Sequence, residues 1–323
     1  MILVVGGAGY IGSHVVKQLI QTEEVIVLDN LSTGHREALD KRAVLIEGDL
    51  RDDLLLQQVF EMYPIEAVMH FAACSLVEES VRCPQKYYEN NVYATLQLLK
   101  VMLMHNVKKF IFSSTAAVYG LSQNEPLSET NRTNPINPYG HSKLMIEQIL
   151  HDYAKAYDMQ CTVLRYFNAA GANALEQIGE SHTPESHLIP LLLQHLNGER
   201  ASFSIFGDDY ATKDGTCVRD FVHVDDIARA HILALEALAI EPDAFTIFNL
   251  GNERGYSVME VVELCEQVTG KKTNLYIEKR RAGDPSVLIA SSQKIKKQLG
   301  WQAERDLQSI IRDAWQWHQH PIY

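Results

Sequence analysis

The sequence predicts an α/β fold in which a doubly wound parallel sheet is followed by a smaller, mixed α/β C-terminal domain. Short apolar runs alternate with helical segments through the first half of the chain, and each run ends in small or polar residues. This alternation stops after residue 171, and residues 172–187 predict a loop. We therefore expect one domain over residues 1–171 and about 222–252, and another over about 172–221 and 253–323.

The chain begins with a predicted buried strand over residues 2–5, a turn containing Gly6, Gly9 and Gly12, and a helix over 11–20. Missing side chains let a backbone approach phosphates closely, and the N–H groups and dipole at a helix start attract negative charge. This Rossmann-type arrangement predicts a dinucleotide pyrophosphate site.

Asp29 ends the next apolar run, about 20 residues after the glycine turn. A carboxylate there suits the adenosine ribose hydroxyls and repels a 2′-phosphate, so it favours NAD over NADP. A glycine-rich turn in some other α/β protein is the alternative for this stretch.

Further apolar runs predict the remaining strands of the sheet. Ligands of such sheets bind beyond the carboxyl ends of the strands, so the polar residues that follow these runs should converge. The second half adds helices whose starts carry capping signals, Asp225 and Asp226 for one and Ser257 with Glu260 for the other. The expected strands cover 25–28, 44–46, 67–71, 110–112, 161–165 and 245–250, apolar segments cover 188–196 and 202–207, and the helices cover 227–238 and 257–269.

Composition restricts the partners. The chain has 323 residues, 46% of them hydrophobic, and a net charge of −12, which argues against nucleic acid and anionic membranes. No apolar run approaches the ~18 residues of a membrane span, and we expect no signal peptide. Five scattered cysteines without a C-x-x-C pair predict reduced thiols in a cytoplasmic protein, with no metal site.

The catalytic candidates lie at a predicted helix start, where Asn137 is a good N-cap and Pro138 a good first residue. Tyr139 and Lys143 are four residues apart and share one face of that helix. A nearby ammonium and the helix N-terminus favour phenolate, which gives a general base for a hydroxyl. Thr115, at the end of a strand, is placed to bind the same oxygen. Alone, this spacing is more often a surface Tyr and Lys; with the glycine turn and Asp29 it predicts catalysis.

With these pieces in place, the chain resembles the extended short-chain dehydrogenase/reductase family, and within it the NAD-dependent nucleotide-sugar epimerases, nearly end to end. The resemblance rests on Gly6–Gly12, Asp29–Ser32, Gly48–Leu50, His70–Ala72, Tyr87–Val92, Phe112–Thr115, Pro138–Gly140, Leu164–Asn168, Phe206–Tyr210, Asp214–Val224 and Arg280–Asp284.

The resemblance implies reversible epimerisation of UDP-galactose and UDP-glucose at C4 through a 4-keto sugar, within galactose metabolism. Hydride would be stored on tightly bound NAD, with Tyr139 as the base, and homodimers would form through helices near 87–104 and 138–157. The implied cofactor residues are Gly6, Gly9, Tyr10, Ile11, Gly12, Asp29, Asn30, Ser32, Asp49, Leu50, Phe71, Ala72, Ala73, Asn90, Thr115, Tyr139, Lys143 and Phe167; the implied substrate residues are Thr115, Tyr139, Asn168, His187, Leu188, Ser204, Phe206, Arg219, Arg281, Asp284 and Leu288.

The sequence departs from the common bacterial pattern of this family at four positions. Thr115 replaces a frequent serine and keeps the hydroxyl, whereas Ser75 replaces a lysine that often contacts the cofactor. Phe221 replaces a frequent tyrosine, and Leu288 replaces a large tyrosine of the sugar pocket.

Three other functions are weighed against this one. UDP-N-acetylglucosamine 4-epimerisation differs only in the sugar. A nucleotide-sugar 4,6-dehydratase would need an acid–base pair after the hydroxyl residue, where this chain has Ala116 and Ala117. A non-enzymatic NAD-sensing protein would be free to lose Tyr139 or Lys143, and both are present.

Overall fold

The computed structural model describes residues 1–121, 126–240, 244–281 and 284–323. The chain forms two compact units: unit 1 is Met1–Gly120, Thr133–Arg165 and Ala228–Phe248, and unit 2 is Leu121–Arg132, Tyr166–Ile227 and Asn249–Tyr323. Residues 121–132, 166–171, 222–227 and 249–252 thus group with unit 2, although the sequence assigns them to the first domain. Backbone pairing accounts for this, since Leu127 bridges Ala290 and Asn168 pairs with Phe221.

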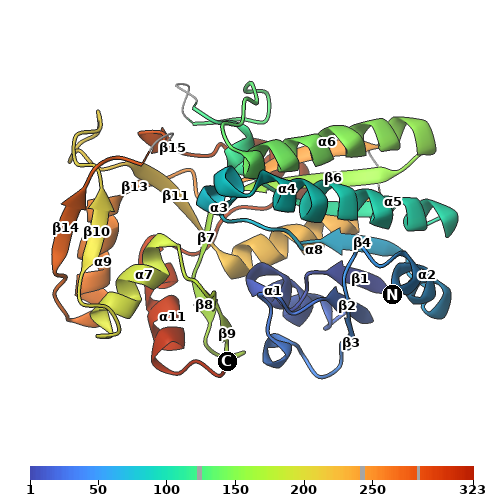
Figure 1. The fold of residues 1–323 in the computed structure, drawn as a ribbon, viewed down its shortest axis with the longest axis horizontal. Coiled ribbons are helices and arrows are strands. Elements are labelled where there is room, and N and C mark those ends of the chain that lie inside the picture. Colours follow the sequence, from blue (N-terminus) through green and yellow to red (C-terminus); the bar gives the residue numbers. More distant parts are fainter. Residues whose placement is uncertain (122–125, 241–243, 282–283) are drawn as a thin grey trace. The chain divides into compact units, whose positions relative to one another are not determined.

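Unit 1 is built on a seven-stranded sheet with the order β12-β6-β5-β4-β1-β2-β3 (Figure 1). β1 pairs in parallel with both β2 and β4, so the strand order reverses beside β1. The sheet is the doubly wound one that the sequence predicts. Unit 1 holds β1 (Ile2–Val5), α1 (Tyr10–Leu19), β2 (Val25–Asp29), η1 (Arg36–Ala38), β3 (Val44–Glu47), α2 (Asp53–Met62), β4 (Ala67–His70), α3 (Val77–Arg82), α4 (Pro84–Tyr87), η2 (Tyr88–Tyr93), α5 (Ala94–Met104), β5 (Lys109–Thr115), η3 (Ala116–Val118), α6 (Pro138–Tyr157) and most of β6 (Gln160–Tyr166), α8 (Val224–Ile240) and β12 (Phe245–Leu250).

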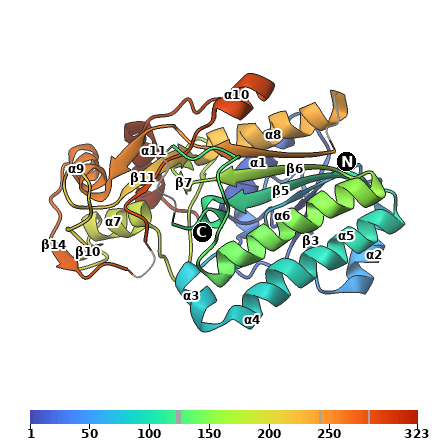
Figure 2. The same ribbon diagram turned by 90° about the horizontal axis from the view of Figure 1, so that it is seen from above.

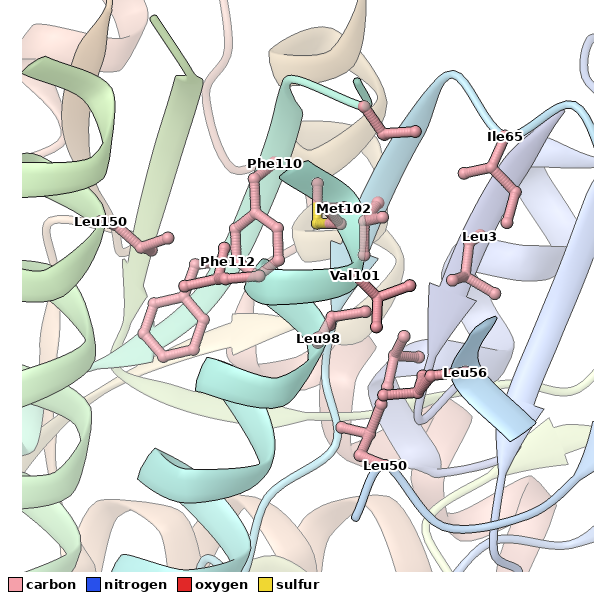
Figure 3. Close-up of a cluster of buried hydrophobic side chains, with 14 of the residues drawn as sticks. Leu3, Leu50, Leu56, Ile65, Leu98, Val101, Met102, Phe110, Phe112 and Leu150 are labelled. Carbon is pink, nitrogen blue, oxygen red and sulfur yellow. The ribbon is translucent and has the colours of Figure 1, made fainter. Parts of the chain in front are cut away.

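Helices cover both faces of this sheet. Figure 2 shows α2, α5 and α6 on one face and α1 and α8 on the other. The core beneath α5 is apolar and fully buried: Leu98 and Met102 lie near Phe110 and Phe112 of β5 (Figure 3). The strands are apolar on both faces because helices cover both, as expected for a parallel sheet.

Unit 2 packs three helices against short strands. α7, α9 and α11 contact one another, and their apolar faces form a core with Phe203, Ile205 and Phe221. A capping box between Ser257 and Glu260 starts α9, as predicted. Unit 2 holds β7 (Asn168–Ala170), β8 (Ala172–Asn173), β9 (Ile178–Gly179), α7 (Leu188–Leu196), β10 (Phe203–Phe206), β11 (Val218–His223), β13 (Gly255–Ser257), α9 (Val258–Thr269), β14 (Leu275–Glu278), β15 (Val287–Leu288), α10 (Gln293–Leu299) and α11 (Leu307–Gln319).

Most predicted elements are present with boundaries shifted by one to three residues. The expected loop over 172–187 instead contains the short hairpin β8–β9, and α8 begins at Val224 with Asp225 and Asp226 in its first turn. All five cysteines are free thiols. Across the described residues, no helix combines the length and the apolar character that a membrane crossing requires.

Candidate functional site

The glycine turn joins β1 to α1 in unit 1, and the space available for a side chain differs among its glycines. Gly6 has φ +76°, and a Cβ on it would lie 2.4 Å from the amide nitrogen of Ala72. A Cβ on Gly12 would lie 2.2 Å from the carbonyl oxygen of Gly6. A Cβ on Gly9 would meet nothing closer than that same oxygen, at an ordinary 3.5 Å. The fold therefore requires Gly6 and Gly12, whereas Gly9 keeps a space open that the protein itself does not fill.

The start of α1 lies next to that space. Gly9 is the N-cap residue, no side chain caps the helix, and its first turn, with Tyr10 and Ile11, holds no acidic residue. A helix N-terminus of this kind attracts an anion through its N–H groups and its dipole. The turn thus has the features that a pyrophosphate site needs.

Asp29 ends β2 and is buried. Its carboxylate accepts hydrogen bonds from the amides of Ala8 and Leu31, each at 2.9 Å. Burial raises its pKa, and these two bonds oppose the rise. Each carboxylate oxygen can accept a second bond, so Asp29 both fixes the turn and retains acceptor capacity for a ribose hydroxyl.

Asp49 follows β3 and belongs to a polar group at the same edge of the sheet. Asn30 donates a hydrogen bond to it at 3.1 Å, and Arg51 forms a bidentate ion pair with it. The hydrogen bond from Arg51 holds the pKa of Asp49 well below its usual range. Leu50 is buried and Ser32 is exposed. Arg51 is a member of this group that the sequence analysis did not identify.

The segment after β4 approaches the glycine turn from the other side. The amides of Phe71 and Ala72 both donate to the carbonyl of Val5. Because β1 and β4 flank the point where the strand order reverses, these residues and Ala73 lie where such sheets bind ligands. Asn90 donates to Asn91, and Asn91 in turn bonds both backbone polar groups of Cys74.

The predicted catalytic residues meet at the start of α6. Asn137 caps this helix by accepting a hydrogen bond from the amide of Gly140, and Pro138 is its first residue, as predicted. Burial raises the pKa of Tyr139, and a hydrogen bond with the Thr115 hydroxyl opposes that rise. The sequence predicts that Lys143 lowers this pKa; in the structure burial raises it, and Thr115 rather than Lys143 opposes the rise.

Lys143 is buried one turn further along α6. Its ammonium donates to the carbonyl of Ser113 at 2.8 Å and lies 4.8 Å from the ring centre of Phe112. Burial lowers the pKa of Lys143 to about 7, and the charge of Glu147 opposes that fall. Near neutral pH this side chain is therefore able to give up and regain a proton.

A buried ion pair ties α6 to the sheet. Arg165 of β6 pairs with Glu147 of α6, and both side chains are at most 4% exposed. Arg165 also donates to the Tyr119 hydroxyl at 3.0 Å, and Ser114 donates to Glu147. Nothing in the sequence pattern pointed to this pair, because its partners are 18 residues apart and belong to different elements.

Part of the predicted substrate set comes together in unit 2. Arg219 of β11 forms an ion pair with Asp284 at 3.0 Å and donates to the carbonyl of Pro285 at 2.9 Å. β11 and β15 pair in parallel, with Arg219 opposite Leu288. The guanidinium therefore contacts the carboxylate, and the backbone of Arg219 lies beside that of Leu288.

A second guanidinium of unit 2 lies over an aromatic ring. Arg281 is 4.0 Å from the ring centre of Phe206, which follows Ser204 on β10. Asn168 donates to the carbonyl of Asp220 at 2.9 Å, which fixes its side chain beside β11. The family motif between Arg281 and Asp284 runs through residues 282–283, which lie outside the described residues.

His187 is the N-cap residue of α7, and Leu188 is the first residue of that helix. The Nδ1 atom of His187 lies 2.6 Å from Glu180 and 3.2 Å from Glu185. Burial lowers its pKa, but the hydrogen bonds to these carboxylates outweigh burial and raise it to about 10. Phe167 also lies in unit 2, whereas the other predicted cofactor residues lie in unit 1.

Comparisons with known proteins show which family this chain resembles in sequence and fold. The family model "NAD dependent epimerase/dehydratase family" matches residues 2–251. A UDP-glucose 4-epimerase from Halalkalibacterium halodurans is 53% identical, over 99% of this chain and 96% of the relative.

Solved structures give the same result. A crystal structure of a UDP-glucose 4-epimerase matches with a TM-score of 0.96 and 50% identity, over 98% of this chain and 97% of the other. The enzyme from Bifidobacterium longum, solved in complex with NAD+ and UDP, matches with a TM-score of 0.94 and 38% identity, over 98% of each chain. The chain therefore belongs to the NAD dependent epimerase/dehydratase family.

Proposed function

We propose that this chain is a UDP-glucose 4-epimerase, which interconverts UDP-galactose and UDP-glucose at C4 of the hexose. The observation that carries the proposal is the hydrogen bond between Tyr139 and Thr115 at the junction of β5 and α6, with Lys143 buried one turn further along α6. High identity to curated UDP-glucose 4-epimerases over the full chain supports the same reaction.

In the proposed reaction, Tyr139 takes the proton of the C4 hydroxyl and later returns it. Thr115 binds the phenol oxygen of Tyr139 and offers its hydroxyl to the same substrate oxygen. Burial lowers the pKa of Lys143 to about 7, so this side chain is able to exchange a proton near neutral pH. Removal of this proton allows C4 to lose its hydride, and the 4-keto sugar that results regains a hydride on its opposite face.

The residues of unit 1 fit NAD, which relatives also carry. The open space at Gly9, the uncapped start of α1 and the carboxylates of Asp29 and Asp49 suit a pyrophosphate and its ribose. NAD, when bound, supplies the hydride chemistry at C4 and is restored at the end of each cycle. Burial of Asp29 beside the turn disfavours the 2′-phosphate of NADP, since two anions would then meet in a poorly hydrated site.

The UDP portion is proposed to bind unit 2. A pyrophosphate in a protein of net charge −12 needs local guanidinium groups, and Arg219 and Arg281 supply them. Asp284 orients Arg219 through their ion pair, and the face of the Phe206 ring attracts the guanidinium of Arg281. Asn168, His187, Leu188, Ser204 and Leu288 complete the proposed contacts.

A 4,6-dehydratase fits the structure less well. That reaction removes water across C5 and C6 and needs an acid and a base close to the hydroxyl residue. Thr115 is followed by the short turn η3, whose three residues Ala116, Ala117 and Val118 carry no proton-transferring group.

The deciding experiment is to incubate the purified protein with UDP-galactose and no added cofactor, and to measure UDP-glucose. We expect turnover, and we expect Tyr139→Phe to lower kcat at least ~10²-fold because it removes the proton-accepting oxygen. UDP binding should hardly change in that variant, and Tyr63→Phe at the end of α2 serves as the matched control. Normal turnover by Tyr139→Phe would place the base elsewhere; a 4-keto-6-deoxy product would instead favour the dehydratase.

We also propose that the protein is a cytoplasmic homodimer. α5 and α6 lie side by side (Figures 1 and 2), and large apolar side chains are exposed on these helices and the turn before them. Five free thiols support a reducing compartment. Sedimentation at micromolar concentration tests the dimer, and substitution of the most exposed of these side chains by glutamate should give monomers. The exposed apolar residues are Tyr88, Tyr93, Met104, Met145 and Tyr157, of which Met104 is the most exposed.

A further inference from the structure

Four side chains with metal-ligating atoms converge in the segment between β9 and α7 of unit 2. They are Glu180, His182, Glu185 and His187, and one ligand atom from each lies within 4.8 Å of all the others. The proposed epimerase reaction gives this group no chemistry, and only His187 has a proposed substrate contact. The group is therefore a separate feature of the molecule.

Three of the four distances between imidazole nitrogen and carboxylate oxygen are close to the ligand spacing of a small coordination sphere; the fourth, between His187 and Glu180, is a hydrogen bond that a bound metal would lengthen. Zinc binds imidazole nitrogen and carboxylate oxygen at about 2.0–2.2 Å, which puts adjacent tetrahedral ligands about 3.4 Å apart. The Nδ1 atom of His187 is 2.6 Å from Glu180 and 3.2 Å from Glu185. The Nδ1 atom of His182 is 3.2 Å and 3.7 Å from the same two carboxylates. Each imidazole thus faces both carboxylates, as alternating corners of one site would.

The surrounding structure holds these side chains in place without a metal. Glu180 follows β9, and its carbonyl accepts a hydrogen bond from the indole of Trp317 at 2.9 Å. One oxygen of Glu185 accepts from the amides of Ser186 and His187, which leaves the other oxygen facing His182. Ligands whose positions are fixed by the chain itself are what a structural metal site requires.

Charge also favours a dication. The side chains of Glu180 and Glu185 are each only 4% exposed, and two carboxylates this well buried need compensating positive charge. One divalent cation with two neutral imidazoles supplies it, as do two protonated imidazoles. His318 of α11 interacts electrostatically with both carboxylates and belongs to their surroundings. A mixed nitrogen and oxygen donor set selects zinc over magnesium or calcium, which prefer oxygen alone.

We propose that Glu180, His182, Glu185 and His187 bind one zinc ion, which fixes the segment 180–187 to the start of α7. Because His187 and Leu188 are among the proposed substrate contacts, the ion would also fix their position; this consequence alone rests on the proposed function. The zinc takes no part in the reaction.

The test uses the untagged full-length chain, stripped with a chelator and dialysed into metal-free buffer. We expect zinc titration to reach one ion per chain, and cobalt to give the strong visible bands of a tetrahedral site. Glu180→Gln and His182→Gln should each lose the cobalt bands. His151→Gln should keep them, since the exposed pair of His151 with Asp152 on α6 is only a surface contact at 3.6 Å.

Thermal unfolding gives a second measurement that does not depend on activity. Zinc should raise the midpoint of the parent chain and of His151→Gln but not those of the two cluster variants, because a ligand that binds only the folded state stabilises it. A parent chain that binds no zinc would show that protons alone hold the cluster together. Equal binding by all variants would place the metal elsewhere. Either result overturns the proposal, whatever the epimerase assay gives.

Discussion

Lys143 offers a test in which stability and activity should move in opposite directions. Burial lowers its pKa from 10.5 to about 7, so the folded protein binds this proton less tightly than the unfolded chain does. At about 1.4 kcal/mol for each factor of ten, the difference corresponds to at most about 5 kcal/mol of lost stability wherever both states are charged. We therefore expect Lys143→Met to be more stable than the parent protein at pH 6 and much less active.

The contribution of Lys143 to the free energy of unfolding depends on pH. Below pH 7 the Lys143 ammonium is charged in both the folded and the unfolded state, so the loss of stability is at its full value and does not change with pH. Between pH 7 and 10.5 the unfolded chain binds more protons than the folded one, so the stability of the parent protein rises with pH. The advantage of Lys143→Met should therefore shrink by about 3 kcal/mol between pH 7 and 9.5.

The measurement is urea unfolding of the parent protein and of Lys143→Met from pH 6 to 9.5, with NAD removed from every sample because Lys143 is itself an expected cofactor contact. Lys100→Met is the matched control, because that lysine is half exposed and forms a surface ion pair with Asp53. Its stability difference should stay within about 0.5 kcal/mol at all pH values. A pH-independent difference for Lys143→Met would mean that this lysine keeps its ordinary pKa when folded, and the argument from burial would fail.

Three further outcomes are expected. The purified protein should release NAD and no NADP on denaturation, because the carboxylate of Asp29 borders the ribose site; an NADP-loaded protein would contradict this role. Gly12→Ala should cost about 1–3 kcal/mol of stability because its Cβ would lie 2.2 Å from the carbonyl oxygen of Gly6. Gly9→Ala should fold normally but lose NAD. Equal melting temperatures for the two variants would contradict this difference in packing. Leu288→Ser should raise the kcat/KM for UDP-N-acetylglucosamine relative to that for UDP-glucose, because a smaller side chain admits the acetamide. Leu288→Tyr should abolish activity on UDP-N-acetylglucosamine. A ratio that is the same in all three proteins would show that Leu288 does not line the sugar pocket.

The sequence predicted the parts of this protein that local chemistry determines. The glycine turn, the cap formed by Asn137 and the capping box of α9 depend on residues within a few positions of one another, and all three are present. Their spacing was therefore enough to place them. The roles of the predicted site residues remain predictions.

The burial of a side chain by distant parts of the chain could not be predicted from the sequence pattern. The low pKa of Lys143 depends on how much of the fold covers it, and the pair of Glu147 with Arg165 depends on how α6 packs on β6. The segment 172–187 was predicted only as a loop, although its alternating Glu and His residues were a visible signal. That spacing became informative only when the chain turn brought the four side chains together.

The pair of Glu147 with Arg165 restricts how this sequence can evolve. Loss of either partner leaves an uncompensated charge inside unit 1, at a cost of about 3–5 kcal/mol, whereas exchange of both for apolar residues of similar volume is often tolerated. A lineage must therefore cross a poorly folded intermediate, or first acquire stabilising substitutions elsewhere. Since α6 also carries Tyr139 and Lys143, a change at this neighbouring pair would also disturb the position of the reacting hydroxyl.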